Sequence, residues 1–134
     1  EKKVDILVAG VGSGGTITGI GRCFKNLNKD IQIIAVEPTE SPFLSKGISG
    51  SHNIQGIGAG FAPKNLDKGI IDRIFTVDFS QASNTVKELA ITEGILVGIS
   101  SGASLFAAKE IAKEHHNKHK NIVVIFPDGG DRYL

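Results

Sequence analysis

The sequence predicts an α/β fold with an open, mostly parallel twisted sheet and helices on both of its faces. Short apolar runs bounded by glycine or proline alternate with longer segments in which apolar residues recur at helical spacing. The links around the first helical segment are short, which favours parallel strands joined by a right-handed crossover. At 134 residues the chain is long enough for one domain but short for a complete α/β enzyme, so we expect a piece of a longer chain.

A strand, a glycine-rich turn and a helix make up the stretch 4–27. The apolar run that ends at Ala9 is typical of a strand buried on both faces, and glycines dominate positions 10–15. The helix begins at Thr16, and its apolar stripe consists of Ile17, Ile20, Phe24 and Leu27. In such a unit the loop amides and the free N–H groups of the helix point to one place, where the helix dipole adds positive potential. We therefore expect an anion there, and a phosphate suits it best.

The local pattern leaves open which phosphate this is. Gly10, Gly12 and Gly15 satisfy the dinucleotide-binding pattern G-x-G-x-x-G, and Glu37 lies where a ribose-binding acid is expected. A tight turn with no ligand is the alternative, whereas a Walker A loop is excluded because no Lys-Ser or Lys-Thr follows the glycines. Hydroxyl donors can come from Ser13, Thr16 and Thr18.

The middle of the chain is less regular. A second strand over 31–36 ends at Glu37-Pro38, and the stretch 39–70 then shows little periodicity and contains six glycines. Long loops of this kind are usually functional or mobile. Small residues alternate at its centre, 53–61, and would let backbone lie against a flat ligand or a facing loop. A flexible surface connector is the alternative.

The next strand and helix carry clear boundary signals. The run 73–77 is typical of a strand, and Asp78 is a good N-cap with Gln81 three residues later, as in a capping box. Gly94 ends this helix.

The last third of the chain repeats the order of strand and helix. The brief apolar run 95–99 is read as a strand that leads into a helix through about Lys118, with Ser100 and Ser101 favoured as plain N-caps. A last buried strand covers 121–126. Because ligands bind at the carboxyl ends of such strands, we expect three loops to border one crevice: 10–16, 98–102 and 127–131.

Composition excludes several classes of function. Fifteen basic against fourteen acidic residues give a net charge of +1, so no overall field favours nucleic acid or an anionic membrane. No apolar stretch approaches the length of a membrane span. Cys23 is the one cysteine; it is expected to be buried or half-buried, and a reducing compartment fits its isolation.

The histidines do not predict a metal site. His115, His116 and His119 lie at a helix end beside lysines, without a carboxylate or thiol placed as a further ligand, so a solvated helix terminus is the better account. His52 has no evident partner in the sequence. We therefore expect no metal.

Six motifs follow one another along the chain: Gly12-Ser13-Gly14-Gly15-Thr16, Val36-Glu37-Pro38, Gln55-Gly56-Ile57-Gly58-Ala59-Gly60-Phe61, Gly94-Ile95-Leu96, Gly98-Ile99-Ser100-Ser101-Gly102-Ala103 and Arg132-Tyr133-Leu134. In this order they closely resemble the carboxyl-terminal portion of cysteine synthase, or O-acetylserine sulfhydrylase, of the pyridoxal-phosphate-dependent β-substituting family. The resemblance implies the tryptophan synthase β-like fold, here incomplete. Residues 1–134 would be a single domain, the larger part that binds the cofactor phosphate.

The resemblance also implies the site. The phosphate becomes that of pyridoxal 5'-phosphate, and it would be bound by the amides and hydroxyls of Gly12, Ser13, Gly14, Gly15 and Thr16. Ser100 would hydrogen-bond the pyridine nitrogen without forcing it to stay protonated, as a carboxylate would. The substrate-side loop would consist of Gln55, Gly56, Ile57 and Gly58.

In the family's reaction, O-acetyl-L-serine loses its α-proton and acetate to leave an aminoacrylate, which sulfide attacks to give L-cysteine. The base is the lysine that first held the cofactor. That Schiff-base lysine belongs to the amino-terminal part of the family, and no lysine of this sequence lies in a matching context. We therefore assign no catalytic residue and expect the chain alone to be inactive.

Three other functions remain open. Cystathionine β-synthase shares the fold and the serine contact but takes homocysteine in place of sulfide. An NAD-binding Rossmann module would use Glu37 on the ribose. A non-catalytic fragment could bind the carboxyl-terminal tail of serine acetyltransferase. For the full-length protein we expect a cytoplasmic homodimer that acts on O-acetylserine and sulfide, with no nucleic-acid or membrane partner.

Overall fold

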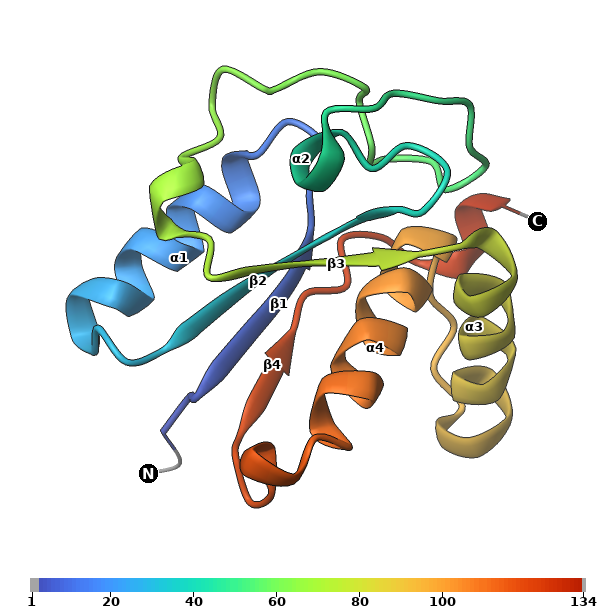
Figure 1. Cartoon of the computed structure of the whole chain (residues 1–134). Helices are drawn as coiled ribbons and strands as arrows, with labels where there is room; N and C mark the ends of the chain where they lie inside the picture. Colours follow the sequence, from blue (N-terminus) through green and yellow to red (C-terminus); the bar gives the residue numbers. More distant parts are fainter. Residues whose placement is uncertain (1–2, 134) are drawn as a thin grey trace.

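A four-stranded parallel sheet forms the centre of the molecule in the computed structural model, which describes residues 3–133 (Figure 1). The strand order is β3-β2-β1-β4. The strands are β1 (Ile6–Gly10), β2 (Gln32–Pro38), β3 (Arg73–Val77) and β4 (Ile122–Val124). Val8 in β1 pairs with Ile34 of β2 on one side and Val124 of β4 on the other. The predicted parallel sheet is confirmed, and all four carboxyl ends lie at the same edge.

Helices cover both faces of this sheet, as the sequence predicts. On one side lies α1 (Gly15–Leu27), and on the other lie α3 (Phe79–Glu93) and α4 (Ile99–Ala112) (Figure 1). A short α2 (Phe43–Lys46) follows β2. The described residues also contain three 3-10 turns: Lys68–Ile70, His115–Asn117 and Gly130–Tyr133. Within the described residues, no helix combines the length and the apolarity that crossing a membrane needs.

Two apolar cores result from the alternation of side chains along the strands. Ile6 and Val8 of β1 point to the face covered by α3 and α4, where they pack in a cluster with Ala103 and Ala107. Leu7 lies in the opposite cluster, against α1. Apolar residues on both faces of β1 explain why its sequence reads as one continuous apolar run.

The start of α1 and the whole of α3 agree closely with the sequence. The first helix begins at Gly15, one residue before the predicted start. Asp78 accepts a hydrogen bond from the Gln81 amide at 2.8 Å and donates its own amide to the Gln81 side chain at 3.0 Å, so the predicted capping box is present. At the far end of α1, however, Leu27 is 77% exposed and does not pack on the sheet as its spacing suggests.

The strand predicted over 95–99 is wrong. Residues 95–98 connect α3 to α4 outside the sheet, and Ile99 is the first residue of α4; only Val97 pairs, through an isolated antiparallel bridge to Gly129. Apolar residues favour an extended backbone, but a strand also needs a neighbour, and the order β3-β2-β1-β4 offers none to this segment.

Three boundaries near the carboxyl end also differ from the prediction. Gly98, not a serine, is the N-cap of α4, and its amide donates to the Asp128 carbonyl at 3.3 Å. The helix ends at Ala112 instead of reaching Lys118. The last strand covers three residues, Ile122–Val124, within the predicted 121–126. Leu134 of the sixth motif lies outside the described residues.

The stretch 39–70 is irregular, as predicted, but its centre packs on the domain. Ile54 is fully buried and Ile57 is 7% exposed, and both belong to the core beneath α4. A flexible surface connector would not bury two isoleucines. The segment is therefore fixed in place where it passes the ends of β1 and β2.

Candidate functional site

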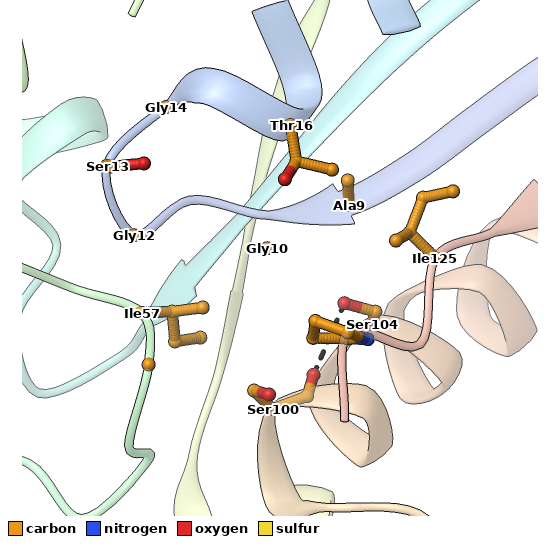
Figure 2. Close-up of a pocket in the computed structure, with 12 residues that line it drawn as sticks. Ala9, Gly10, Gly12, Ser13, Gly14, Thr16, Ile57, Ser100, Ser104 and Ile125 are labelled. Carbon is orange, nitrogen blue, oxygen red and sulfur yellow. Dashed lines mark hydrogen bonds between the residues drawn. The ribbon is translucent and has the colours of Figure 1, made fainter. Parts of the chain in front are cut away.

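A cavity of about 140 Å³ opens at the carboxyl ends of β1 and β4 (Figure 2). The chain leaves β1 through α1 on one face and reaches β4 from α4 on the other face, so the cavity lies where the connections diverge. Such switch points are the usual ligand sites of open α/β sheets. The lining residues are Ala9, Gly10, Gly12, Ser13, Gly14, Thr16, Gly56, Ile57, Ser100, Ser104, Ile125 and Pro127. The predicted crevice thus brings together parts of all three predicted loops.

The glycine-rich turn forms the upper wall of this cavity (Figure 2). Gly14 is the N-cap of α1 and has a φ of 86°, which side chains disfavour. At Gly12 a Cβ would run into the carbonyl oxygen of Gly56. The N-cap position supplies no side-chain hydrogen bond to the first turn of α1. Backbone donors and the positive end of the helix dipole therefore face the cavity, which is the arrangement that binds phosphate.

The three predicted hydroxyl donors separate into two groups. Ser13 and Thr16 are exposed and line the cavity, and Figure 2 shows the Thr16 side chain directed into it. Thr18 is buried away from the site, where its Oγ1 accepts a hydrogen bond from the Asp67 amide at 3.0 Å. The expected contribution of Thr18 is therefore wrong.

The first turn of α4 forms the opposite wall. Ser100 is 4% exposed and lines the cavity, with its hydroxyl 3.5 Å from Oδ1 of Asp128. The same carboxylate oxygen lies 3.3 Å from the hydroxyl of Ser101, which is fully buried. Ser104 lies one turn further along and donates to the Ser100 carbonyl at 3.3 Å, as the dashed line in Figure 2 shows.

Sequence reasoning missed two lining residues, Ser104 and Ile125, and placed Pro127 and Asp128 only within a predicted loop. Ser104 has a signal, because it lies four residues after Ser100 and so shares its face of the helix. Ile125 and Pro127 reach the cavity only because β4 pairs with β1. Asp128 is part of a predicted turn, and its bonds to the serines depend on that same pairing.

The predicted substrate-side loop is divided by the structure. Gly56 and Ile57 line the cavity. Gln55 is exposed and is not a lining residue, and Gly58 borders a neighbouring, smaller hollow beside Glu37. Gly15 of the phosphate loop is likewise outside the lining set, although its amide lies 3.4 Å from the Ser13 hydroxyl.

Glu37 does not have the environment of a ribose-binding acid. Its side chain is 1% exposed, and its two carboxylate oxygens accept hydrogen bonds from the amides of Leu44 and Ser45, at 2.8 and 2.9 Å. The carboxylate is thus engaged with the first turn of α2. Glu37 is therefore not free to bind a ribose, as the dinucleotide alternative requires.

Two further predictions need correction. Cys23 is exposed rather than buried, because it lies beside the apolar stripe of α1 and not within it. His52 does have partners: its ring nitrogens contact the Ile54 amide and the Gly58 carbonyl. Among the described residues, no group of three or more His, Cys, Asp or Glu side chains is arranged to hold a metal ion.

Comparison with known proteins gives the family. Residues 1–128 match the family model described as "Pyridoxal-phosphate dependent enzyme". The chain belongs to this family. The family's cofactor is the one that the sequence motifs predict, and the donor set of the cavity fits a phosphate ester with a ring.

Within the pyridoxal-phosphate family, the chain is similar to cysteine synthases over its whole length. It is 53% identical to the "Cysteine synthase" of Haemophilus influenzae, covering 100% of this chain and 45% of the relative. It is 44% identical to "Cysteine synthase A" of Escherichia coli, covering 100% of this chain and 44% of that protein. The predicted resemblance is confirmed, and the chain spans less than half the length of these relatives.

Solved structures of the family agree. An O-acetyl serine sulfhydrylase (isoform 3) from Entamoeba histolytica superposes with a TM-score of 0.96 at 41% identity, covering 98% of this chain and 39% of that one. A hydrogen sulfide-producing enzyme from Fusobacterium nucleatum gives 0.95 at 40% identity, covering 98% and 45%. The predicted fold class is confirmed.

Proposed function

We propose that this chain is the part of a cysteine synthase that binds the phosphate and the ring of pyridoxal phosphate. The observation that carries the proposal is the cavity between two helix N-termini, with the amides of the glycine turn on one wall and Ser100 on the other. A ligand that joins an anion to an aromatic ring would reach both sets of donors, because they line one cavity. The similarity to cysteine synthases supports the same conclusion.

The residues of this chain would then hold and orient the cofactor. The amides at Gly12–Thr16 and the hydroxyls of Ser13 and Thr16 would bind the phosphate. Ser100 would meet the ring nitrogen, and Gly56 and Ile57 would exclude water from one side of the ring. Bound pyridoxal phosphate supplies an electron sink for carbanions next to the substrate amino group.

For the whole protein we propose cysteine formation from O-acetyl-L-serine and sulfide by β-replacement, in which acetate leaves and sulfide takes its place. None of the described residues that line the cavity is a lysine, so the cavity itself offers no amine for the covalent link and no base of that kind. We therefore propose that the chain alone binds cofactor without catalysing turnover. Cystathionine β-synthase, with homocysteine as the thiol, is the related alternative for the whole protein.

The test is a titration of the purified chain with pyridoxal phosphate, followed by absorbance, borohydride reduction and intact mass. We expect saturable binding, no reduced lysine adduct, and no turnover of O-acetylserine and sulfide. A parallel titration with NAD should show no binding, because Glu37 is already engaged. Binding of NAD and not of pyridoxal phosphate would refute the proposal, and turnover by the chain alone would refute its inactivity.

The partners of the whole protein are proposed on the same basis. Capture of a serine acetyltransferase tail ending in isoleucine is tested by a peptide-binding assay with this chain, in which no association would argue against it. The cytoplasmic homodimer also stays a prediction.

A further inference from the structure

The ring of His52 closes a short loop beside the cavity. We call residues 52–58 the wall loop. Nδ1 of His52 accepts a hydrogen bond from the Ile54 amide at 3.1 Å, and Nε2 lies 2.9 Å from the Gly58 carbonyl oxygen. An amide N–H can only donate and a carbonyl can only accept, so the contacts fix a neutral imidazole with its proton on Nε2.

The wall loop contacts the glycine turn at three successive residues. The Gly56 carbonyl lies so close to Gly12 that a Cβ on Gly12 would collide with it. The Ile57 side chain lies where a Cβ on Gly10 would come within 2.7 Å of it. The Gly58 amide donates to the Val11 carbonyl at 3.0 Å. Any shift of the wall loop would therefore also displace the glycine turn that faces the cavity.

Gly58 is the point where the two sets of contacts meet. Its amide donates to Val11 of the glycine turn, and its carbonyl contacts His52. It has a φ of 69°, and a Cβ there would meet Pro38 at 2.6 Å and the His52 ring at 2.7 Å. The far end of the wall loop is thus fixed from both sides, and one of the two sides is a single side chain.

We propose that His52 is a positioning residue that holds Gly56 and Ile57 against the glycine turn and so sets the shape of the phosphate-binding wall. This inference rests on the proposed function, because the proposed function is what assigns phosphate binding to this wall. The hydrogen bond from Nε2 to the Gly58 carbonyl, which we call the bridge, is the contact that holds the wall loop in position. The bond from Ile54 to Nδ1 only forms a local turn, of the kind that Asn or Asp makes with the amide two residues on.

Two substitutions test the two hydrogen bonds of the His52 ring one at a time. In His52→Asn the amide group takes the place of Nδ1, so it keeps the local turn and loses the bridge. In His52→Gln the amide nitrogen reaches the place of Nε2, so it keeps the bridge. His116→Asn, at an exposed histidine outside the site, is the matched control.

The first measurement needs no cofactor, and its first step needs no mutation. Long-range ¹H–¹⁵N NMR of the full 134-residue chain should show His52 as the Nε2–H tautomer. In amide exchange, Gly58 should exchange faster in His52→Asn than in His52→Gln. An Nδ1–H tautomer, or equal exchange in the two variants, would overturn the proposal even if the chain bound no anion.

The second measurement titrates inorganic phosphate, and then pyridoxal phosphate, while the amides of 12–16 are followed by NMR. We expect His52→Asn to weaken phosphate binding about fivefold, the equivalent of one lost hydrogen bond. His52→Gln and His116→Asn should stay close to the parent chain. Equal weakening in the Asn and Gln variants would show that His52 is merely structural. Failure of the parent chain to bind phosphate would refute the proposed function instead, and the exchange data would still decide the role of His52.

Discussion

The two helix N-termini that face the cavity differ in what occupies them. The N-terminus of α1 has a glycine cap and no side-chain cap bond, so its backbone donors face the cavity. The N-terminus of α4 has two serines whose hydroxyls lie within 3.5 Å of the Asp128 carboxylate. Both helices have the same dipole direction toward the site, but only α1 presents it without a carboxylate. The comparison teaches that the groups at a helix N-terminus, more than the dipole, decide which part of a ligand it accepts.

The largest loss of binding is expected when a side chain is added to the glycine turn that precedes α1. In Gly12→Ala the new methyl group would collide with the Gly56 carbonyl, so either the turn or the wall loop must move. We expect phosphate binding to fall about 10- to 100-fold, in line with the usual strain of overpacking. Isothermal titration with pyridoxal phosphate measures the loss.

Gly19→Ala is the control for this change. Gly19 lies in α1, which follows the glycine turn, and a methyl group added there would have no atom within 4 Å. The substitution should therefore leave binding intact and raise the free energy of unfolding by about 0.5–1 kcal/mol. Equal loss of binding in both variants would mean that the geometry at Gly12 is not what forms the site.

On the α4 side, the expected loss is in the free energy of unfolding and not in binding. Asp128→Ala removes the acceptor that the nearly buried hydroxyls of Ser100 and Ser101 share. We expect the free energy of unfolding to fall by about 1–3 kcal/mol in urea denaturation, the usual result when buried donors lose their partner. Asp128→Asn keeps an acceptor oxygen and should lose clearly less. If the two variants are equally unstable, the serines do not depend on this acceptor.

These two sides differ in how far the sequence could predict them. The α1 side is local, because the strand, the glycine turn and the helical spacing are contiguous, and the same holds for the Asp78 capping box. The α4 side depends on contacts with residues 125–128, which β4 brings to the site. Hydroxyls beside a helix start are typical of N-caps, and the sequence does not show that the Asp128 carbonyl holds Gly98 in that position.

The same distinction between local sequence and tertiary contacts explains the other predictions that were wrong. The run 95–99 has strand composition but no strand beside it. Glu37 has the spacing of a ribose acid, but α2 folds back so that two amides take its carboxylate. His52 has no partner within the pattern, because its partners are backbone groups that only the loop conformation brings to the ring. Spacing predicts elements, whereas the partners of polar side chains depend on tertiary structure.

A smaller effect should separate ring binding from phosphate binding. Ser100→Ala removes the hydroxyl on the α4 wall and leaves the α1 turn untouched. We expect pyridoxal phosphate to bind about fivefold more weakly and inorganic phosphate to bind as before. Ser101→Ala, at the neighbouring buried serine outside the lining set, is the control and should change neither affinity. Weaker binding of inorganic phosphate in Ser100→Ala would show that both walls contact the same group.

The smallest effect concerns two threonines in the first turn of α1. Thr16 is exposed and lines the cavity, whereas the buried Thr18 accepts the Asp67 amide. Replacement by valine keeps the branched shape and removes the hydroxyl. Thr16→Val should weaken phosphate binding about twofold to fivefold at unchanged stability, and Thr18→Val should leave binding unchanged and lower the free energy of unfolding by about 1 kcal/mol. If Thr18→Val also weakened binding, the Asp67 contact would be part of what shapes the turn, and the site would extend beyond the cavity.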